Sequence, residues 1–228
     1  MRITDVKAYV VAPDLPGLRR QGGDLSEWQW TFVTVHTDEG ITGWGESSNV
    51  PRNASLLTGA GVQAVKEALV GEDPADIERL WHKVYRRYSY LGARGFPPTV
   101  LSGIDIALWD IKGKALGRPV YDLLGGKFRD TIRTYANGWF INCETPAQYG
   151  AAAKKVVRSG HDAVKLDPFL EMVPFHTMYQ TGQISAEGEQ EGYDIVAAVR
   201  EAVGPHVEIL IDAHGHYNVP AAIRLGNT

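Results

Sequence analysis

Asp212 and His214 are the two residues whose types and spacing most directly suggest chemistry. They follow the apolar run Val207–Ile211, which we predict to be a buried parallel strand. Because side chains alternate along a strand, residues two apart are expected to point the same way. A hard oxygen ligand beside a proton carrier indicates a divalent metal with an acid–base partner. The alternative is an Asx turn that caps the strand, with a solvated histidine.

Two further strand-like segments precede this one, and helical segments separate them. Thr145 is the expected N-cap of one helix, because Pro146 follows it at the first helical position. Alternating strands and helices predict a parallel sheet or barrel, in which the carboxyl ends of the strands carry the chemistry. The predicted strands are residues 132–137, 163–167 and 207–212, and the predicted helices are residues 145–159, 189–203 and 219–225.

The first half of the chain has a different order of elements. β-Branched and aromatic residues predict three strands, and the turn Thr37–Gly40 joins the last two. The segment 13–27 is rich in proline and glycine and is expected to be a mobile binding loop. Apolar residues at helical spacing predict three helices after the strands. The predicted strands are residues 2–11, 28–37 and 41–47, and the predicted helices are residues 53–70, 74–91 and 99–116, followed by a short helical turn at 119–126.

The composition argues against a nucleic-acid-binding or membrane-spanning protein. The 228 residues carry a net charge of −4 and contain no basic block, which argues against nucleic acid or an anionic membrane as a partner. No apolar run approaches the roughly 18 residues of a membrane span. Cys143 is the only cysteine. A lone cysteine and a strand-like N-terminus are typical of a cytoplasmic protein without a signal peptide.

Several strings of residues resemble those of the enolase superfamily. The strand Gly40–Glu46 is followed by Asp105–Lys114, which reads D-I-A-L-W-D-I-K-G-K, and by Leu123–Gly126, which reads L-L-G-G. Together they are similar to the mandelate racemase and muconate-lactonizing branch. The resemblance implies an α/β fold, with an N-terminal α+β capping domain over residues 1–126. Residues 127–228 would then form the start of a (β/α) TIM-like barrel, with about three of the expected units present.

The resemblance also implies a reaction and assigns roles. Members of this branch use Mg²⁺ to stabilise the enediolate that forms when a proton is removed beside a carboxylate. Asp212 matches the first metal ligand of the family. His214 matches the acid of the galactonate-dehydratase-like group, which protonates a departing hydroxyl. The other metal ligands and the usual His–Asp base belong to later strands that this sequence does not contain.

The same resemblance suggests the remaining candidates. Lys165 is expected to contribute to catalysis by orienting the substrate carboxylate, and an ion pair with Asp167 is the alternative. Asp167 stands where racemases of the family have a second lysine, which argues against lysine-based racemisation. We expect Asp167 and His216 to bind the substrate. His216 is placed at the mouth of the site, with a solvated loop as the alternative for it and Tyr217. The residues expected to bind the distal part of the substrate are Arg19, Arg20, Trp28 and Arg52.

These inferences predict a Mg²⁺-dependent dehydratase of a sugar acid such as an aldonate, which forms a 2-keto-3-deoxy acid. The first alternative is a racemase or epimerase on the same scaffold. The second alternative is a non-catalytic fragment, which would apply if 228 residues were the natural full length. We further expect a small acid-sugar substrate as the partner and assembly into a homo-oligomer.

Overall fold

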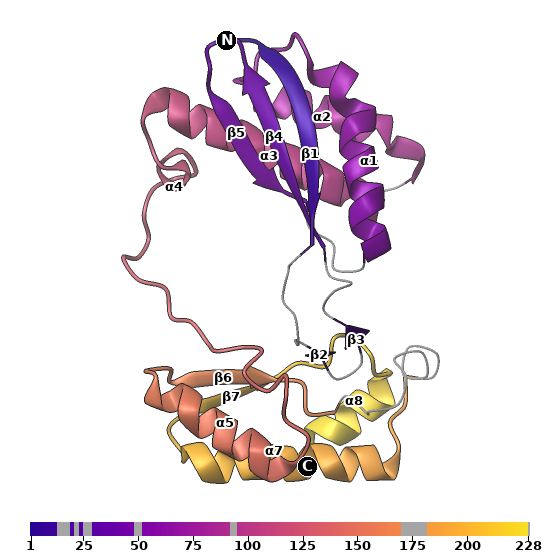
Figure 1. Ribbon diagram of the computed structural model, residues 1–228, viewed down its shortest axis with the longest axis vertical. Coiled ribbons are helices and arrows are strands. Elements are labelled where there is room, and N and C mark those ends of the chain that lie inside the picture. The colour runs from indigo at the N-terminus through magenta and orange to yellow at the C-terminus, as the bar shows by residue number, and fades with distance from the viewer. Residues whose placement is uncertain are drawn as a thin grey trace. The chain divides into compact units, whose positions relative to one another are not determined.

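The chain divides into two compact units, which we describe separately. The computed structural model describes residues 1–12, 19–20, 23–24, 29–47, 52–91, 95–169 and 182–227. The first unit comprises Met1–Pro16 and Leu25–Asp130, and the second comprises Gly17–Asp24 and Thr131–Thr228. Figure 1 shows a three-stranded sheet with its helices in the first unit and a pair of parallel strands with helices in the second.

The first unit is built on an antiparallel sheet in the order β1-β4-β5. The strands are β1 (Ile3–Val11), β4 (Trp30–Thr37) and β5 (Thr42–Glu46), as predicted to within two residues at either end. Val6, Val33 and Val35 are fully buried and belong to the core that the sheet shares with the helices. The helices are α1 (Arg52–Leu69), α2 (Ile77–Arg87), α3 (Phe96–Leu116) and α4 (Val120–Leu123), with a 3₁₀ turn at Ser89–Leu91.

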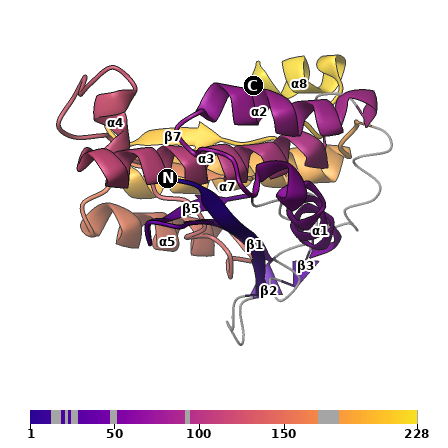
Figure 2. The same cartoon turned by 90° about the horizontal axis from the view of Figure 1, so that it is seen from above.

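Helix α3 runs along one face of the sheet at unusually close range (Figure 2). A Cβ atom added to Gly43 would lie 2.0 Å from the carbonyl oxygen of Ala107, and one added to Gly45 would lie 1.9 Å from that of Gly103. Only glycine fits at these two positions, because both opposing atoms belong to the helix backbone. The glycines of β5 therefore set the distance between sheet and helix.

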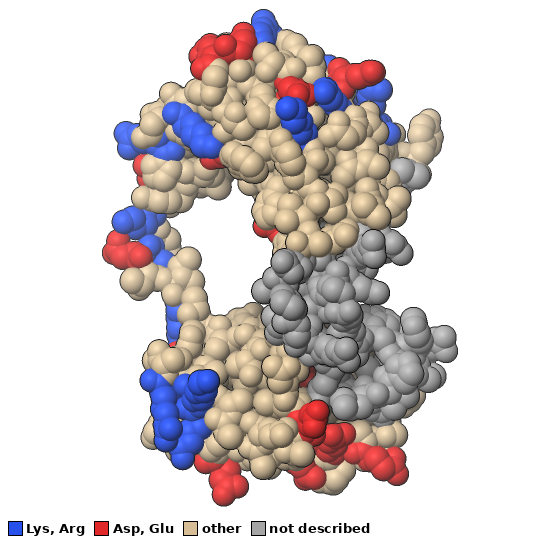
Figure 3. All heavy atoms as spheres, viewed as in Figure 1, with Lys and Arg blue, Asp and Glu red and all other residues tan. Residues whose placement is uncertain are grey.

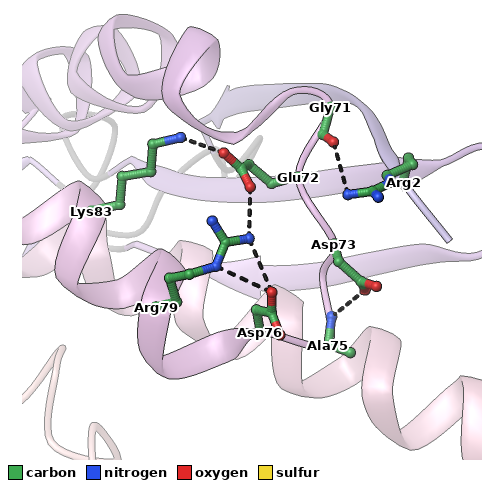
Figure 4. A network of polar contacts seen from close by, with 8 residues as sticks. All are labelled: Arg2, Gly71, Glu72, Asp73, Ala75, Asp76, Arg79 and Lys83. Atoms are coloured by element: carbon green, nitrogen blue, oxygen red, sulfur yellow. Dashed lines mark hydrogen bonds and ion pairs between the residues drawn. The ribbon is translucent and has the colours of Figure 1, made fainter.

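The segment between α1 and α2 is held by a network of polar contacts (Figure 4). The carboxylate of Glu72 accepts hydrogen bonds from Lys83 at 2.5 Å and from Arg79 at 2.6 Å. These two cations lower the pKa of Glu72 from 4.5 to about 2. The prediction that α2 begins at Pro74 is wrong, because the Asp73 carboxylate accepts the backbone N–H of Ala75 at 2.9 Å and forms a turn there.

Many charged side chains of the first unit are exposed and lie close to one another. On the face of the first unit shown in Figure 3, acidic and basic side chains are interspersed. This distribution matches the ion pairs between neighbouring residues, such as Lys114 with Asp110 at 2.6 Å. Such exposed pairs contribute little to stability individually.

The second unit contains the parallel strands β6 (Ala163–Leu166) and β7 (Glu208–Ile211), aligned from Ala163 opposite Glu208 to Leu166 opposite Ile211. The predicted strand over residues 132–137 is wrong: only Ala136 pairs there, in an isolated parallel bridge to Val164. The helices of this unit are α5 (Pro146–Arg158), α7 (Ala186–Val203) and α8 (Val219–Gly226).

Two signals read from the sequence explain the local structure here. Thr145 caps α5 in a reciprocal capping box with Gln148, as its position before Pro146 predicted. Helix α7 begins three residues earlier than predicted, because Ser185 accepts the backbone N–H of Gly188 and acts as its N-cap. Figure 1 also shows the short antiparallel pair β2 (Arg19–Arg20) and β3 (Gly23–Asp24), inside the segment predicted to be a loop.

Candidate functional site at the carboxyl ends of β6 and β7

The candidate site lies where β6 and β7 end. Parallel strands present their carboxyl ends at one edge, so Lys165 in β6 and Asp167 just after it lie near Asp212, the residue that follows β7. The backbone N–H of Asp212 donates to the carbonyl of Leu166 at 3.0 Å, which extends the pairing one residue beyond the strands. The two strand ends are therefore held in register at the point where the polar side chains begin.

Asp212 binds a different partner with each carboxylate oxygen. Its Oδ2 atom forms an ion pair with the ammonium of Lys165, and its Oδ1 atom accepts the backbone N–H of His214 at 2.8 Å. These contacts, with that of Lys165 the larger, lower the pKa of Asp212, and the same ion pair raises the pKa of Lys165. Lys165 thus forms its ion pair with Asp212, and the nearby charge of Asp167 also raises the pKa of Lys165.

A turn places His214 beside the two carboxylates. Strand β7 ends at Ile211, so the expected alternation of side chains along a strand is not what brings Asp212 and His214 together. His214 instead adopts a left-handed backbone conformation with φ of 48°, which histidine tolerates better than most residues. Its Nδ1 atom lies 3.4 Å from Oδ1 of Asp212 and 3.6 Å from Oδ1 of Asp167.

Asp167, Asp212 and His214 each direct one potential ligand atom to a common point. The three atoms lie within 4.8 Å of one another, a spacing that fits a single divalent cation. The Asp167 side chain is 1% exposed, whereas that of His214 is 41% exposed. One wall of the candidate cation site is therefore buried while the imidazole wall faces solvent.

His216 and Tyr217 lie next to the cluster of Asp167, Asp212 and His214. His216 is 3% exposed and its ring stacks on that of His214 with centroids 5.7 Å apart. Burial lowers the pKa of His216. The Tyr217 hydroxyl donates to the main-chain carbonyl of Phe169. The alternative of a solvated loop is therefore wrong for His216, which is a packed residue.

The structure does not describe the side chains that were predicted to bind the distal part of the substrate. Trp28 lies outside the described residues, and so do the side chains of Arg19, Arg20 and Arg52. The sequence interpretation placed Asp167 at the substrate and missed it as a potential cation ligand, and it missed Tyr217 as a link between the two loops. The spacing of Lys165 and Asp167, two residues apart at a strand end, was the available signal for the first.

The site consists of carboxylates and an imidazole at the carboxyl edge of parallel strands, and helices alternate with these strands. Such an arrangement is typical of an α/β-barrel site that could hold a divalent cation. Comparison with known proteins identifies the family. The chain matches the mandelate racemase / muconate lactonizing enzyme N-terminal domain over residues 6–125 and the enolase C-terminal domain-like family over residues 148–228. The chain therefore belongs to the mandelate racemase and muconate lactonizing enzyme family of the enolase superfamily, and the predicted fold class is confirmed.

Several relatives are similar over most of this chain. A D-gluconate dehydratase of Thermoproteus tenax is 39% identical over 194 residues, covering 85% of this chain and 37% of that protein. A D-galactonate dehydratase of Pectobacterium atrosepticum is 36% identical over 224 residues, covering 97% and 50%. A crystal structure of an enolase superfamily member from Salmonella Typhimurium has a TM-score of 0.83 and 33% identity, covering 99% and 57%. The chain thus covers between 37% and 57% of the lengths of these relatives.

Across the described ranges, no helix combines the length and the apolar character that a membrane span requires.

Proposed function

We propose that this protein is a hydro-lyase that acts on a sugar acid of the aldonate type with the help of Mg²⁺. The observation that carries the proposal is the cluster of Asp167, Asp212 and His214 at the ends of β6 and β7. The names of the relatives, D-gluconate dehydratase and D-galactonate dehydratase, support the same substrate class. The product would be a 2-keto-3-deoxy acid.

Asp212 is the residue that we assign to the cation. Mg²⁺ prefers carboxylate oxygen ligands, and both Asp212 and Asp167 offer one within reach of a common point. When bound, the cation would stabilise the second negative charge that develops on the substrate carboxylate as the neighbouring proton is removed. The Asp167 side chain is buried, so water screens its attraction for the cation only weakly.

We assign His214 to the proton that the leaving group needs. Elimination breaks the bond between the β-carbon and its hydroxyl, and the oxygen leaves as water only if it receives a proton. The His214 imidazole is 41% exposed, and its Nδ1 atom lies 3.4 Å from a carboxylate oxygen of Asp212 and 3.6 Å from one of Asp167. A hard cation that is held by oxygen atoms leaves this imidazole free to carry the proton.

Lys165 would orient the substrate carboxylate, because its ammonium lies at the same edge as Asp212. Contacts with the distal hydroxyl groups remain predictions for Arg19, Arg20, Trp28 and Arg52. The base that removes the proton is assigned to none of the described residues. A cytoplasmic location and assembly into a homo-oligomer also remain predictions.

The test is product analysis after incubation with D-gluconate, D-galactonate and Mg²⁺. A keto acid trapped with semicarbazide is the expected result, and its formation should fall at least about hundredfold in His214→Asn, as for other lost general acids. His206→Asn, an exposed histidine of the same unit, is the matched control and should retain activity. Deuterium uptake from solvent without a keto acid would support the racemase or epimerase alternative. No reaction with either sugar acid would support the non-catalytic alternative.

A further inference from the structure

We propose that Lys165 is a built-in competitor for the divalent cation at Asp212. Without a cation its ammonium occupies the carboxylate, and it must leave that position when a cation binds. Replacing Lys165 by a neutral residue should therefore tighten cation binding rather than weaken it. This inference rests on the proposed role of Asp212 as a cation ligand.

The contacts of Asp212 define the competition. One oxygen accepts the His214 backbone N–H at 2.8 Å and the other holds the Lys165 ammonium. The backbone contact belongs to a turn whose shape positions His214, so breaking it would disturb the site. The other contact is made by the ammonium at the end of the flexible lysine side chain, which can move away without moving the backbone. Lys165 is therefore the partner that a cation would displace.

Burial makes this competition strong. The side chains of Lys165 and Asp212 are 17% and 29% exposed, so water screens their charges only in part. An ammonium and a divalent cation that share one carboxylate would lie within a few ångströms of each other and repel. Replacing Lys165 by a neutral residue removes this repulsion and takes one positive charge away from the neighbourhood of Asp212 and Asp167.

Displacement has a consequence for the rest of the site. The base of the Lys165 side chain is fixed by strand β6, so the released ammonium stays at the carboxyl edge of the strands. It then lacks its carboxylate partner and can pair with an anionic group of a ligand. Cation binding and carboxylate binding should therefore favour each other, and the coupling must be equal in both directions.

The experiment is a titration of the full chain with Mn²⁺, in which electron paramagnetic resonance measures the free ion and Mg²⁺ is used as a competitor. We expect Lys165→Met to lower the Mn²⁺ dissociation constant by about tenfold, within the roughly 5- to 150-fold range of coupling between sites. Lys165→Gln is a second neutral variant in case the first fails to fold. Lys165→Arg keeps the charge and should bind like the unmodified protein.

Lys154→Met is the matched control, because Lys154 is exposed on helix α5 of the same unit. Equal tightening in Lys154→Met would mean that net charge alone explains the effect and would overturn the inference. Unchanged binding in both neutral variants of Lys165, together with loss of binding in Asp212→Asn, would overturn it while the cation site stands. Absence of Mn²⁺ binding in every form would reject the cation site itself, and the inference with it.

Discussion

The hydroxyl of Tyr217 holds together the two loops that carry the candidate cation ligands. It donates to the main-chain carbonyl of Phe169, which lies two residues after Asp167, while Tyr217 itself lies three residues after His214. Tyr217→Phe removes this donor and leaves the ring in place. We therefore expect the substitution to loosen the geometry between Asp167 and the loop that carries Asp212 and His214, without emptying the space that the ring fills.

The size of the effect follows from one hydrogen bond. Such a bond contributes about 0.5 to 1.5 kcal/mol net, and more when the acceptor that loses its donor stays away from water. Phe169 is 6% exposed, so water reaches its surroundings poorly. We expect the unfolding free energy of the second unit to fall by about 1.5 kcal/mol, within the cited range. Since about 1.4 kcal/mol is a factor of ten, the Mn²⁺ dissociation constant should rise by no more than about tenfold.

Two measurements separate these consequences. Hydrogen exchange with mass spectrometry reports the opening of the peptides that contain residues 163–169 and 207–217, and a Mn²⁺ titration reports the site. Tyr193→Phe is the matched control, because Tyr193 donates to Glu189 at 2.9 Å within helix α7 and packs against Phe169 through its ring. The control should leave the Mn²⁺ affinity unchanged.

The reasoning would be refuted if Tyr217→Phe exchanged no faster than the unmodified chain over both peptides and bound Mn²⁺ equally well. Faster exchange with unchanged affinity would mean that the hydroxyl stabilises the loops but does not position the ligands. Equal effects in Tyr193→Phe would mean that any lost hydroxyl in this unit acts in the same way.

Three further predictions test the rest of the structure. Gly45→Ala should lower the stability of the first unit by about 3 kcal/mol in urea unfolding, because its Cβ would lie 1.9 Å from a backbone oxygen of α3; a loss under about 1 kcal/mol would contradict that packing. Glu72 has a pKa of about 2 instead of 4.5, so its contribution to stability is present above pH 4.5 and lost as the pH falls toward 2. Glu72→Gln should remove that part of the pH dependence of the urea midpoint, and an unchanged profile would contradict the assignment. Thr145→Ala should cost about 1 kcal/mol in the same assay by removing the capping box of α5, and Thr145→Ser should restore most of it.

Elements whose signals lie within a few residues could be predicted from the sequence. Thr145 and Pro146 start a helix through contacts confined to its first turn, and the structure has that helix from Pro146. The turn Thr37–Gly40 connects two strands for the same reason. The prediction of a strand over residues 132–137 was wrong because a strand also requires a partner along its length. Only Ala136 finds one, and Ile132 is 77% exposed.

The candidate site could be predicted by residue type but not by geometry. Sequence spacing places Lys165 nearest to Asp167, yet its ion-pair partner is Asp212, 47 positions later in the sequence. That choice depends on the register of β6 against β7, in which Lys165 lies opposite Leu210. Cross-strand neighbours are set by tertiary pairing, and spacing along one strand does not report them.

The two explanations that the sequence left open for Asp212, an Asx turn and a cation ligand, are compatible. The carboxylate accepts the His214 backbone N–H at 2.8 Å, which is the contact of an Asx turn. That turn gives His214 its left-handed backbone, and the same turn brings the imidazole to 3.4 Å from the carboxylate and 3.6 Å from Asp167. The turn thus brings His214 close to the carboxylates of Asp212 and Asp167. Because strand β7 has already ended at Ile211, a straight continuation of the strand would carry His214 further from Asp212 than the turn does.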